Sequence, residues 1–274
     1  MAPRTEKKKI GIKTAGIRPA AVHFVGTGPG DPELITVKGM KLLRDAGVVI
    51  YTGSLVRETT LKYCRKRPEV YNSASLTLDE ITALMVKGAR EGKRVVRLHT
   101  GDPSLYGALR EQADKLDEHG VPYEVVPGVS SAFAAAAALK RELTLPEVTQ
   151  TVIFTRLGGR TPVPERERLE SLSKHRATIC VFLSAAMIDK VVASLKKGYP
   201  LATPVAVVYR ASWEDQKIIE GTLKDIARKV KGSGITRQAM IIVGKAAGGE
   251  GSLKKTSKLY DRGFSHGYRK GKRG

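Results

Sequence analysis

The alternation of short apolar, β-rich runs with helix-forming segments constrains this fold more than any other feature of the sequence. The clearest run, Val95–Leu98, ends near Thr100-Gly101-Asp102-Pro103, and a segment that can form a helix follows. Asp102 before Pro103 is typical of a helix N-cap and first helical residue. Ligands of open α/β sheets bind at the carboxyl edge of the strands, so the loop 100–103 is a candidate binding site. An ordinary strand-to-helix turn explains the spacing equally well.

The first half of the chain predicts parallel βαβ units. Strands are expected at 21–25, 48–51, 70–73, 94–98 and 123–126, and helices from residue 37 and at 55–66, 104–119 and 132–139. One further helix opens at Thr77 and Glu80, which have capping-box spacing. We therefore expect a first α/β domain over residues 21–143, with a mainly parallel sheet.

The second half predicts another α/β domain, over residues 149–246. Strands are expected at 149–155, 178–183, 204–209, 216–220 and 239–243, and helices at 165–175, 187–195 and 222–230. Ile218 and Ile219 lie only a short turn after the 204–209 strand, so part of this second sheet should be antiparallel. The predicted fold class is α/β, with two α/β domains, a cleft between them, and a second sheet of mixed direction.

The charge is concentrated at the two ends of the chain. Net charge is +21, and residues 1–20 hold six Lys or Arg against one Glu, while residues 245–274 hold nine against two acidic residues. Residues 1–20 and 247–274 are therefore interpreted as basic, solvated tails that could touch polyanions such as nucleic acid non-specifically. A role in solubility is the preferred explanation, and a nucleic-acid partner is not expected. A positive body also suits a polycarboxylate substrate.

The apolar runs and the cysteines indicate the cellular compartment in which the protein is expected. No run approaches the roughly 20 apolar residues that span a bilayer, and the basic N-terminus lacks the apolar stretch of a secretory signal. Cys64 and Cys180 lie far apart, which gives neither a disulfide framework nor a zinc site. We expect a cytoplasmic protein without a metal and without membrane contact.

A glycine-rich turn follows the first predicted strand, but it does not match a dinucleotide site. Gly26, Gly28 and Gly30 are not spaced as G-x-G-x-x-G, and Pro29 lacks an N–H for a phosphate. No acidic residue ends the second strand, where a ribose-binding carboxylate would lie. Walker-type phosphate binding is excluded too, because no Gly-Lys-Ser/Thr is present.

Three stretches together resemble the signatures of the tetrapyrrole methylases, which are S-adenosylmethionine-dependent enzymes. They are Val25–Thr36, Thr100–Pro103 and Val126–Ser131, in matching order and spacing over residues 21–246. Within this family, Tyr51–Val56, Phe154–Pro162 and Cys180–Ser184 resemble the branch that methylates C11 of precorrin-4 or cobalt-precorrin-4. The uroporphyrinogen-III branch generally carries an Asp after the tyrosine, where this chain has Thr52.

The resemblance implies the tetrapyrrole methylase fold, a homodimer, and a cofactor bound folded between the two domains. The cofactor-binding residues it implies are Pro29, Thr100, Gly101, Asp102, Leu105, Ser130, Ser131, Leu183, Ser184, Ala211, Ala239 and Met240. Small residues let the backbone approach a planar adenine, and Asp102 can accept charge-assisted bonds from the cofactor. The alternatives are core packing for Ala211, Ala239 and Met240, and a helix N-cap for Ser130 and Ser131.

A macrocycle that carries many carboxylates needs cationic contacts. Arginine binds carboxylates bidentately, so Arg156, Arg160 and Arg210 are the predicted substrate-binding residues, although a solvated salt-bridge face is the alternative. Arg97, inside a strand, is expected to pair structurally instead. We predict no catalytic base, since His99 is best explained as a buried, hydrogen-bonded histidine.

Two other functions remain open from the sequence. The first is another reaction in the same fold, on uroporphyrinogen-III, ribosomal RNA or a modified histidine of an elongation factor. An aromatic content of 5% offers little for base stacking and argues against RNA. The second is a non-catalytic module that binds polyanions through its tails.

Overall fold

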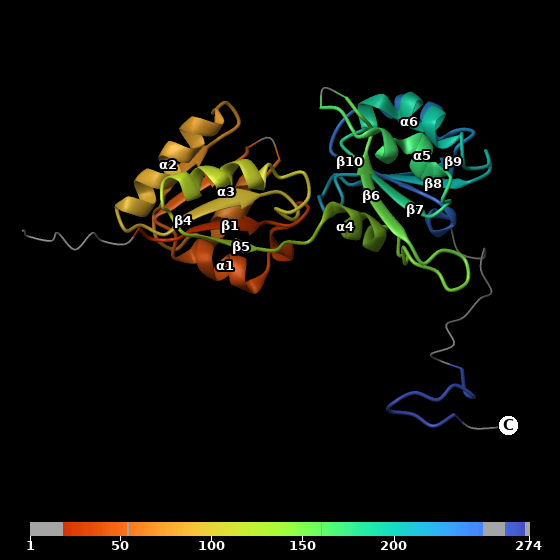
Figure 1. Cartoon of the computed structure of the whole chain (residues 1–274), viewed down its shortest axis with the longest axis horizontal. Coiled ribbons are helices and arrows are strands. Elements are labelled where there is room, and N and C mark those ends of the chain that lie inside the picture. The colour runs from red at the N-terminus through yellow and green to blue at the C-terminus, as the bar shows by residue number, and fades with distance from the viewer. Residues whose placement is uncertain (1–18, 54, 160, 249–260, 272–274) are drawn as a thin grey trace, which may run out of the picture. The chain divides into compact units, whose positions relative to one another are not determined.

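The computed structural model describes residues 19–53, 55–159, 161–248 and 261–271. Most of the two predicted basic tails, residues 1–18, 249–260 and 272–274, lies outside the described residues. The chain divides into two compact units (Figure 1). The first unit contains residues up to Val25, Val37–His99 and Tyr106–Val126, and the second contains Gly26–Thr36, Thr100–Leu105 and Pro127 onward. The sequence-based domain boundaries stay a prediction.

The first unit is built on a five-stranded sheet in the order β3-β2-β4-β1-β5. Its elements are β1 (Val22–Gly26), α1 (Val37–Arg44), β2 (Val48–Tyr51), β3 (Glu69–Asn72), α2 (Leu78–Arg90), β4 (Val95–His99), α3 (Leu109–Glu118) and β5 (Tyr123–Val126). β1 pairs in parallel with β5, and β2 pairs in parallel with β3 and β4, as predicted. Helices α2 and α3 cover one face of this sheet and α1 the other (Figure 1).

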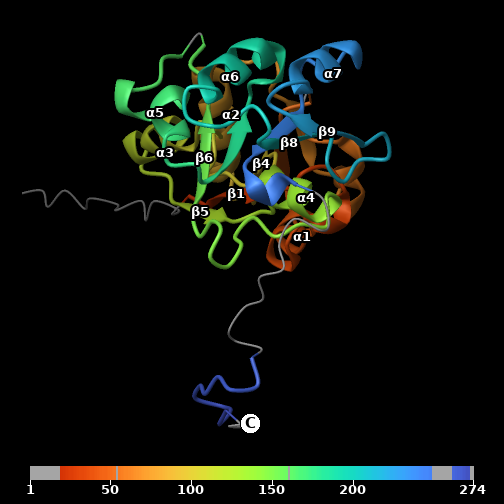
Figure 2. The ribbon, with the colours of Figure 1, turned by 90° about the vertical axis from the view of Figure 1, so that its right-hand side faces the viewer.

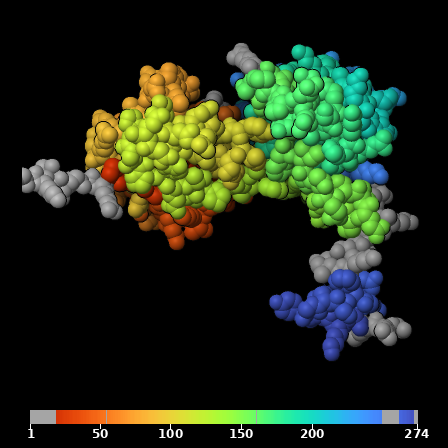
Figure 3. Space-filling model, in the orientation of Figure 1, coloured from red at the N-terminus to blue at the C-terminus, as the bar shows by residue number. Residues whose placement is uncertain are grey.

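The core of the first unit follows from apolar strands and from amphipathic helices. Every residue of β2 and β4 is buried, as expected for inner strands of a parallel sheet covered on both faces. The predicted capping box at Thr77 is confirmed, because Thr77 N–H donates to Glu80 Oε2 at 2.7 Å and Glu80 N–H donates to Thr77 Oγ1 at 3.3 Å. Figure 3 shows the yellow-green atoms of α3 over one face of this unit.

Two helix predictions for the first unit are wrong in extent. The helix expected over 104–119 begins only at Leu109, because Tyr106 and Ala108 adopt left-handed conformations with φ of 54° and 48°. Asp102 does not cap that helix, since its Oδ1 accepts a bond from the N–H of Ser104 at 2.8 Å within a tight turn. The helix expected over 55–66 is a short 3₁₀ helix, Glu58–Tyr63.

The second unit has a mixed sheet in the order β6-β7-β10-β8-β9. Its elements are α4 (Ser131–Ala138), β6 (Val152–Arg156), α5 (Leu169–Ser173), β7 (Thr178–Phe182), α6 (Ile188–Leu195), β8 (Pro204–Tyr209), β9 (Lys217–Thr222), α7 (Ile226–Gly232) and β10 (Ala239–Val243). β6 and β7 are parallel, whereas β10 and β9 run antiparallel to their neighbours. The predicted antiparallel pairing is confirmed, with Val208 opposite Ile218 and Val207 opposite Ile219.

Helix α4 shares its core with the second sheet. Its alanines Ala132, Ala134, Ala135 and Ala136 are buried in one cluster with Cys180, Phe182, Val208, Met240 and Ile242. The remaining helices α5, α6 and α7 belong to a separate cluster, which packs around β7, β8 and β10 (Figure 2). Small side chains therefore let α4 lie close to its sheet. Among the described residues, no helix is both long and apolar enough to cross a bilayer.

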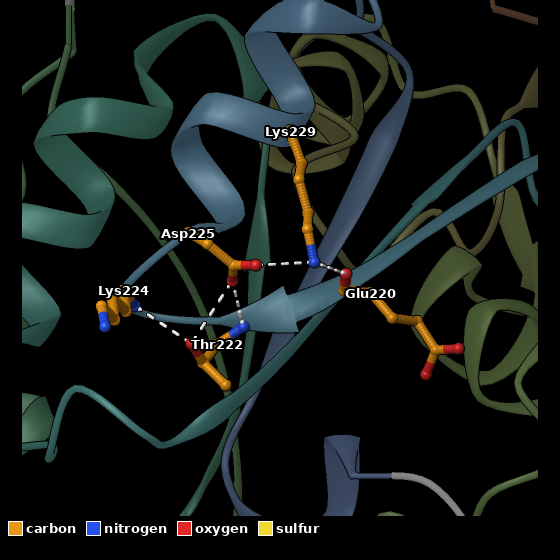
Figure 4. Close-up of polar contacts among 5 residues, drawn as sticks. All are labelled: Glu220, Thr222, Lys224, Asp225 and Lys229. Atoms are coloured by element: carbon orange, nitrogen blue, oxygen red, sulfur yellow. Dashed lines mark hydrogen bonds and ion pairs between the residues drawn. The ribbon is translucent and has the colours of Figure 1, made fainter.

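The turn from β9 into α7 is fixed by one carboxylate (Figure 4). Asp225 Oδ1 accepts the Thr222 N–H at 2.7 Å, and its other oxygen forms an ion pair with Lys229 at 2.6 Å. Lys229 also donates to the Glu220 carbonyl at 2.9 Å. The hydrogen bond to Lys229, followed by the backbone bond from Thr222, lowers the pKa of Asp225 to about 2.

Candidate functional site

One edge of the second sheet gathers residues with unusual backbone conformations. Leu183 follows β7, Arg210 follows β8, and Gln238 precedes the antiparallel β10, so all three lie at the same edge. Their φ angles are 53°, 46° and 55°, in the left-handed region that non-glycine residues rarely adopt. Leu183 is also 69% exposed, although it is apolar. Such strained positions cluster at ligand-binding sites.

Ser184 ties two neighbouring strand ends together at this edge. Its hydroxyl accepts a bond from the N–H of Leu157 at 2.9 Å, and it donates to the Phe182 carbonyl at 2.6 Å. Ser184 is fully buried. Its hydroxyl therefore holds the loop after β6 against the loop after β7, and leaves Leu183 as the exposed residue between them.

The first glycine-rich motif is attached to the loop that follows β8. The N–H of Asp31 donates to Ser212 Oγ at 3.0 Å, and the indole N–H of Trp213 donates to the Pro29 carbonyl at 2.8 Å. A Cβ on Gly30 would lie 1.9 Å from the indole nitrogen of Trp213. Gly30 is thus required by the close approach of Trp213, and not by a phosphate.

The second motif joins the first through paired backbone bonds. Gly28 N–H donates to the Gly101 carbonyl at 3.3 Å, and Gly101 N–H donates to the Gly28 carbonyl at 2.7 Å. Gly101 has a φ of +62°, and the nearest atoms that its Cβ would meet are 3.9 Å away. A side chain there would make only ordinary van der Waals contacts, so the backbone of this turn is not crowded on that side.

The third motif joins the second through Asp102. Its Oδ2 accepts the N–H of Gly128 at 2.9 Å, and a Cβ on Gly128 would lie 2.1 Å from the Gly101 carbonyl oxygen. Each carboxylate oxygen of Asp102 thus accepts one backbone bond and keeps capacity for another. Three motifs that are spread over about a hundred residues of sequence thus form one cluster of backbone within the second unit.

The serines and small residues lie where this cluster meets the sheet. Ser130 is the N-cap of α4 and accepts the Ala132 N–H at 3.3 Å, which confirms the capping interpretation; Ser131 is the first helical residue. Ala211 and Met240 are buried in the α4 cluster, as the core-packing alternative expects, and Leu105 packs against that cluster. Ala239 is half-buried.

The two predicted substrate arginines that the structure describes have partners within the protein. Arg156 donates to the carbonyls of Thr161 and Pro162 at 3.0 and 3.1 Å, and so shapes its own loop. Arg210 donates to Gln238 at 2.8 Å, pairs with Asp215 at 2.5 Å, and lies over the Trp213 ring at 4.8 Å. Arg160 lies outside the described residues.

All twelve predicted cofactor-binding residues, together with Arg156 and Arg210, fall within the second unit. Sequence reasoning missed Ser212 and Trp213, which hold the first motif at the sheet edge. Trp213 is the single tryptophan of the chain and comes four residues after the end of β8, and this was the available signal. Its partner is 184 residues away, so no local pattern could reveal the contact.

The chemistry of this edge suits a nucleoside that carries a positive charge. Backbone groups at Gly101, Ala211 and Ala239 are free of bulky side chains, Leu183 offers an exposed apolar face, and Asp102 offers a carboxylate. Burial raises the pKa of the nearby Cys180 thiol to about 12, so it stays neutral. Among the described residues, no three His, Cys, Asp or Glu side chains form a group that could hold a metal.

Comparisons with known proteins identify the family. The description "Tetrapyrrole (Corrin/Porphyrin) Methylases" matches residues 21–227. The chain is similar to a cobalt-precorrin-4 C(11)-methyltransferase of Methanocaldococcus jannaschii, with 58% identity over 91% of this chain and 96% of the relative. It is also similar to a precorrin-4 C(11)-methyltransferase of Pseudomonas aeruginosa, with 48% identity over 91% of this chain and 99% of the relative.

Solved structures agree with this result. An X-ray structure of a cobalt precorrin-4 methyltransferase matches with a TM-score of 0.81 and 49% identity, over 83% of this chain and 96% of that one. A uroporphyrin-III C-methyltransferase from Thermus thermophilus, complexed with S-adenosylhomocysteine, matches with a TM-score of 0.69 and 28% identity, over 83% and 98%. The chain therefore belongs to the tetrapyrrole methylases. As a member of that family it is a methyltransferase, and the suspected resemblance is confirmed.

Proposed function

We propose that this protein transfers a methyl group from S-adenosylmethionine to C11 of precorrin-4 or cobalt-precorrin-4. The observation that carries the methyl-donor site is the convergence of three glycine motifs at one edge of the second sheet. The choice of ring and carbon is supported by the names of the two relatives reported above. Because the relative with 58% identity acts by name on the cobalt form, we expect the cobalt-containing ring to be preferred.

The cofactor is expected to bind through backbone groups more than through side chains. Gly101, Ala211 and Ala239 would accept or donate bonds to the adenosine, and Leu183 would cover one face of the base. Asp102 would accept from the ammonium or ribose hydroxyls with its remaining lone pairs. Pro29, Thr100, Leu105, Ser130, Ser131, Ser184 and Met240 would complete the surroundings.

The bound cofactor supplies a sulfonium methyl group, which is already an activated electrophile. The residues of this chain then have to hold and align the two reactants and exclude water from them. Alignment of this kind is worth up to about 7–11 kcal/mol of the barrier in favourable cases. The rigid backbone cluster around Gly28, Gly101 and Gly128 is well suited to this task, because it is fixed by paired hydrogen bonds.

Substrate binding is expected to involve the loop that follows β6. Arg156 holds the carbonyls of Thr161 and Pro162, and Arg160 precedes these two residues directly in the sequence. Arg210 is balanced by Asp215, so its contribution should be to position Trp213 and Gln238.

Methyl transfer from ¹³C-labelled S-adenosylmethionine tests this function. We expect one label, located at C11 by NMR, on cobalt-precorrin-4 or precorrin-4, and no label on uroporphyrinogen III. Label at another carbon, or label on uroporphyrinogen III alone, would contradict the proposal. Removing residues 1–18 and 249–274 should leave this transfer intact, whereas a polyanion-binding module would lose its salt-dependent affinity.

A further inference from the structure

Arg97 is a buried cation surrounded by neutral groups. It lies in β4 and is 5% exposed. Its Nε donates to Gln112 Oε1 at 3.0 Å, one terminal nitrogen donates to Ser73 Oγ at 3.0 Å, and the other donates to Thr52 Oγ1 at 3.4 Å. Among the described residues, no carboxylate forms an ion pair with it. The expected structural pair is thus replaced by a set of neutral hydrogen bonds.

In this arrangement the Arg97 guanidinium has no counter-charge among the described residues, and it keeps N–H donors that the three partners do not use. Burial lowers the pKa of Arg97 to about 10, so the guanidinium is still charged at neutral pH. A guanidinium has five N–H donors, and the described partners take three of them. Buried charges in proteins are normally paired, because an uncompensated one is expensive to keep out of water.

Other arginines of the first unit do not share this situation. Arg94 pairs with Asp45 at 3.2 Å and Arg110 with Asp114 at 2.7 Å, and both are well exposed. In those cases solvent and a carboxylate both stabilise the charge. Arg97 has neither solvent nor a carboxylate beside it. An anion that bound there would therefore stabilise the charge more than it would at an exposed arginine.

The position of Arg97 leaves a route for a ligand. Thr52 directly follows β2 and Ser73 directly follows β3, so both lie at the carboxyl edge of a parallel sheet, where ligands bind. Thr52 is half-buried and Gly53 is exposed, whereas Gln112 on the other side is buried. The long bond to Thr52 is also the weakest of the three. Of the three partners Thr52 is the only one that is not buried, so the Thr52 side is the side from which a carboxylate would approach the guanidinium.

We propose that Arg97, together with Thr52, binds a carboxylate of the tetrapyrrole substrate. The proposal rests on the proposed function for the identity of the ring. Guanidinium and carboxylate match as a two-bond fork, and the Thr52 hydroxyl, whose contact with Ser73 Oγ is 3.3 Å, can give the carboxylate one further donor. The Ser73 hydroxyl donates to the Tyr51 carbonyl at 3.2 Å, so its part is to hold the guanidinium in place. Acetate and propionate arms of the ring carry this chemistry.

Arg97→Gln tests the proposal because the two roles predict different results. Loss of a substrate contact raises KM without lowering Tm, whereas loss of a structural contact lowers Tm without changing KM. The amide keeps polar contacts with Ser73 and Gln112 but removes the charge. We expect KM for cobalt-precorrin-4 to rise by at least about tenfold, as for loss of a charged hydrogen bond. The Kd for S-adenosylhomocysteine should stay the same, and Tm should stay the same or rise. A purely structural arginine gives the reverse pattern, a lower Tm with an unchanged KM, and that result would overturn the proposal.

Thr52→Asp is the complementary variant, since it supplies a carboxylate from within the chain. An internal anion beside Arg97 should raise Tm and compete with the substrate, so that KM rises. Thr52→Asn has nearly the same size as Thr52→Asp but no charge. It should raise KM less than Thr52→Asp does, and it should not raise Tm. Arg94→Gln is the matched control for removing an arginine from the same unit, and it should leave KM unchanged. An unaltered KM in Thr52→Asp would contradict the assignment.

Direct binding distinguishes failure of this inference from failure of the proposed function. If the wild-type protein methylates neither ring, the proposed function fails, and the Kd of the stable polycarboxylate uroporphyrin III then decides the inference. Weaker binding to Arg97→Gln than to wild type supports it, and equal binding overturns it. Sodium acetate tests whether the site binds a free carboxylate instead of the ring. In that case acetate raises the Tm of wild type but not of Arg97→Gln, and KM for the ring is equal in both. That combination would overturn the proposal.

Discussion

The carboxyl edges of the two sheets handle positive charge in opposite ways. At the edge of the first sheet, Arg97 is buried among the neutral groups of Thr52, Ser73 and Gln112. At the edge of the second sheet, Arg210 is half-buried and has a carboxylate, an amide and two aromatic rings around it. One edge retains an unmatched charge, and the other has its charge fully matched.

The difference separates two kinds of binding surface. A matched arginine stiffens the protein that contains it, and at the second edge it positions Trp213, which in turn holds Pro29. An unmatched buried arginine weakens the empty protein and strengthens a complex with an anion. We therefore expect the second edge to bind the methyl donor through backbone groups, and the first to bind an acidic ring through charge.

Gly128→Ala should have the largest effect and would break the second edge alone. The new Cβ would lie 2.1 Å from the Gly101 carbonyl oxygen and 2.8 Å from Gly26 Cα, and both of these are backbone atoms that cannot easily move away. We expect a loss of about 1–3 kcal/mol in the free energy of unfolding and at least a tenfold higher Kd for S-adenosylhomocysteine. Calorimetry and titration measure both. Gly232→Ala is the control, because its Cβ meets nothing within 4 Å, and it should change neither value.

Arg156→Ala should have the next largest effect. It compares an arginine that shapes a loop, Arg156, with one that is proposed to bind the ring by its charge, Arg97. Without its bonds to Thr161 and Pro162, the loop after β6 loses its fixed shape. We expect KM for the tetrapyrrole to rise several-fold while the Kd of the cofactor product stays constant. If cofactor binding is lost instead, the role in substrate binding is wrong.

Trp213→Phe removes one hydrogen bond from the second edge and keeps an aromatic ring near Arg210. Loss of the bond to the Pro29 carbonyl should lower stability by about 0.5–1.5 kcal/mol and weaken S-adenosylhomocysteine binding by a few fold. Trp213→Ala should weaken it further. Tyr209→Phe, which keeps the other ring over Arg210, is the control, and an equal effect there would exclude a specific role for Trp213.

Asp225→Asn should have the smallest effect, since this turn lies outside both binding surfaces. The pKa of Asp225 is lowered to about 2, so its carboxylate stabilises the fold above the unfolded pKa near 3.9 and loses this role as pH falls toward 2. The Tm of the variant should therefore be slightly lower than that of wild type at pH 5–7, and the gap should narrow below pH 4. A gap that widens in acid would contradict this assignment.

Much of the fold could be predicted from the sequence, because local patterns determine it. β2 begins and ends where the run Val48–Tyr51 does, and the Thr77 capping box acts over three residues. Predictions failed where distant contacts decide. Asp102, expected at a helix N-cap, instead accepts the N–H of Ser104 and the N–H of Gly128, which is 26 residues away.

The candidate site divides in the same way. The three glycine motifs could be found in the sequence from their spacing, but the reason for each glycine could not. Gly30 makes room for Trp213, and Gly128 makes room for Gly101. Arg97 was expected to pair structurally because it lies inside a strand. Only the three-dimensional structure shows that its described neighbours are neutral.

A crystal structure with S-adenosylhomocysteine tests the central claim most directly. We predict that its adenosine contacts the backbone of Gly101, Ala211 and Ala239 and lies against Leu183. A nucleoside held by the strands β2, β3 and β4 of the first unit, with the glycine motifs empty, would contradict this account.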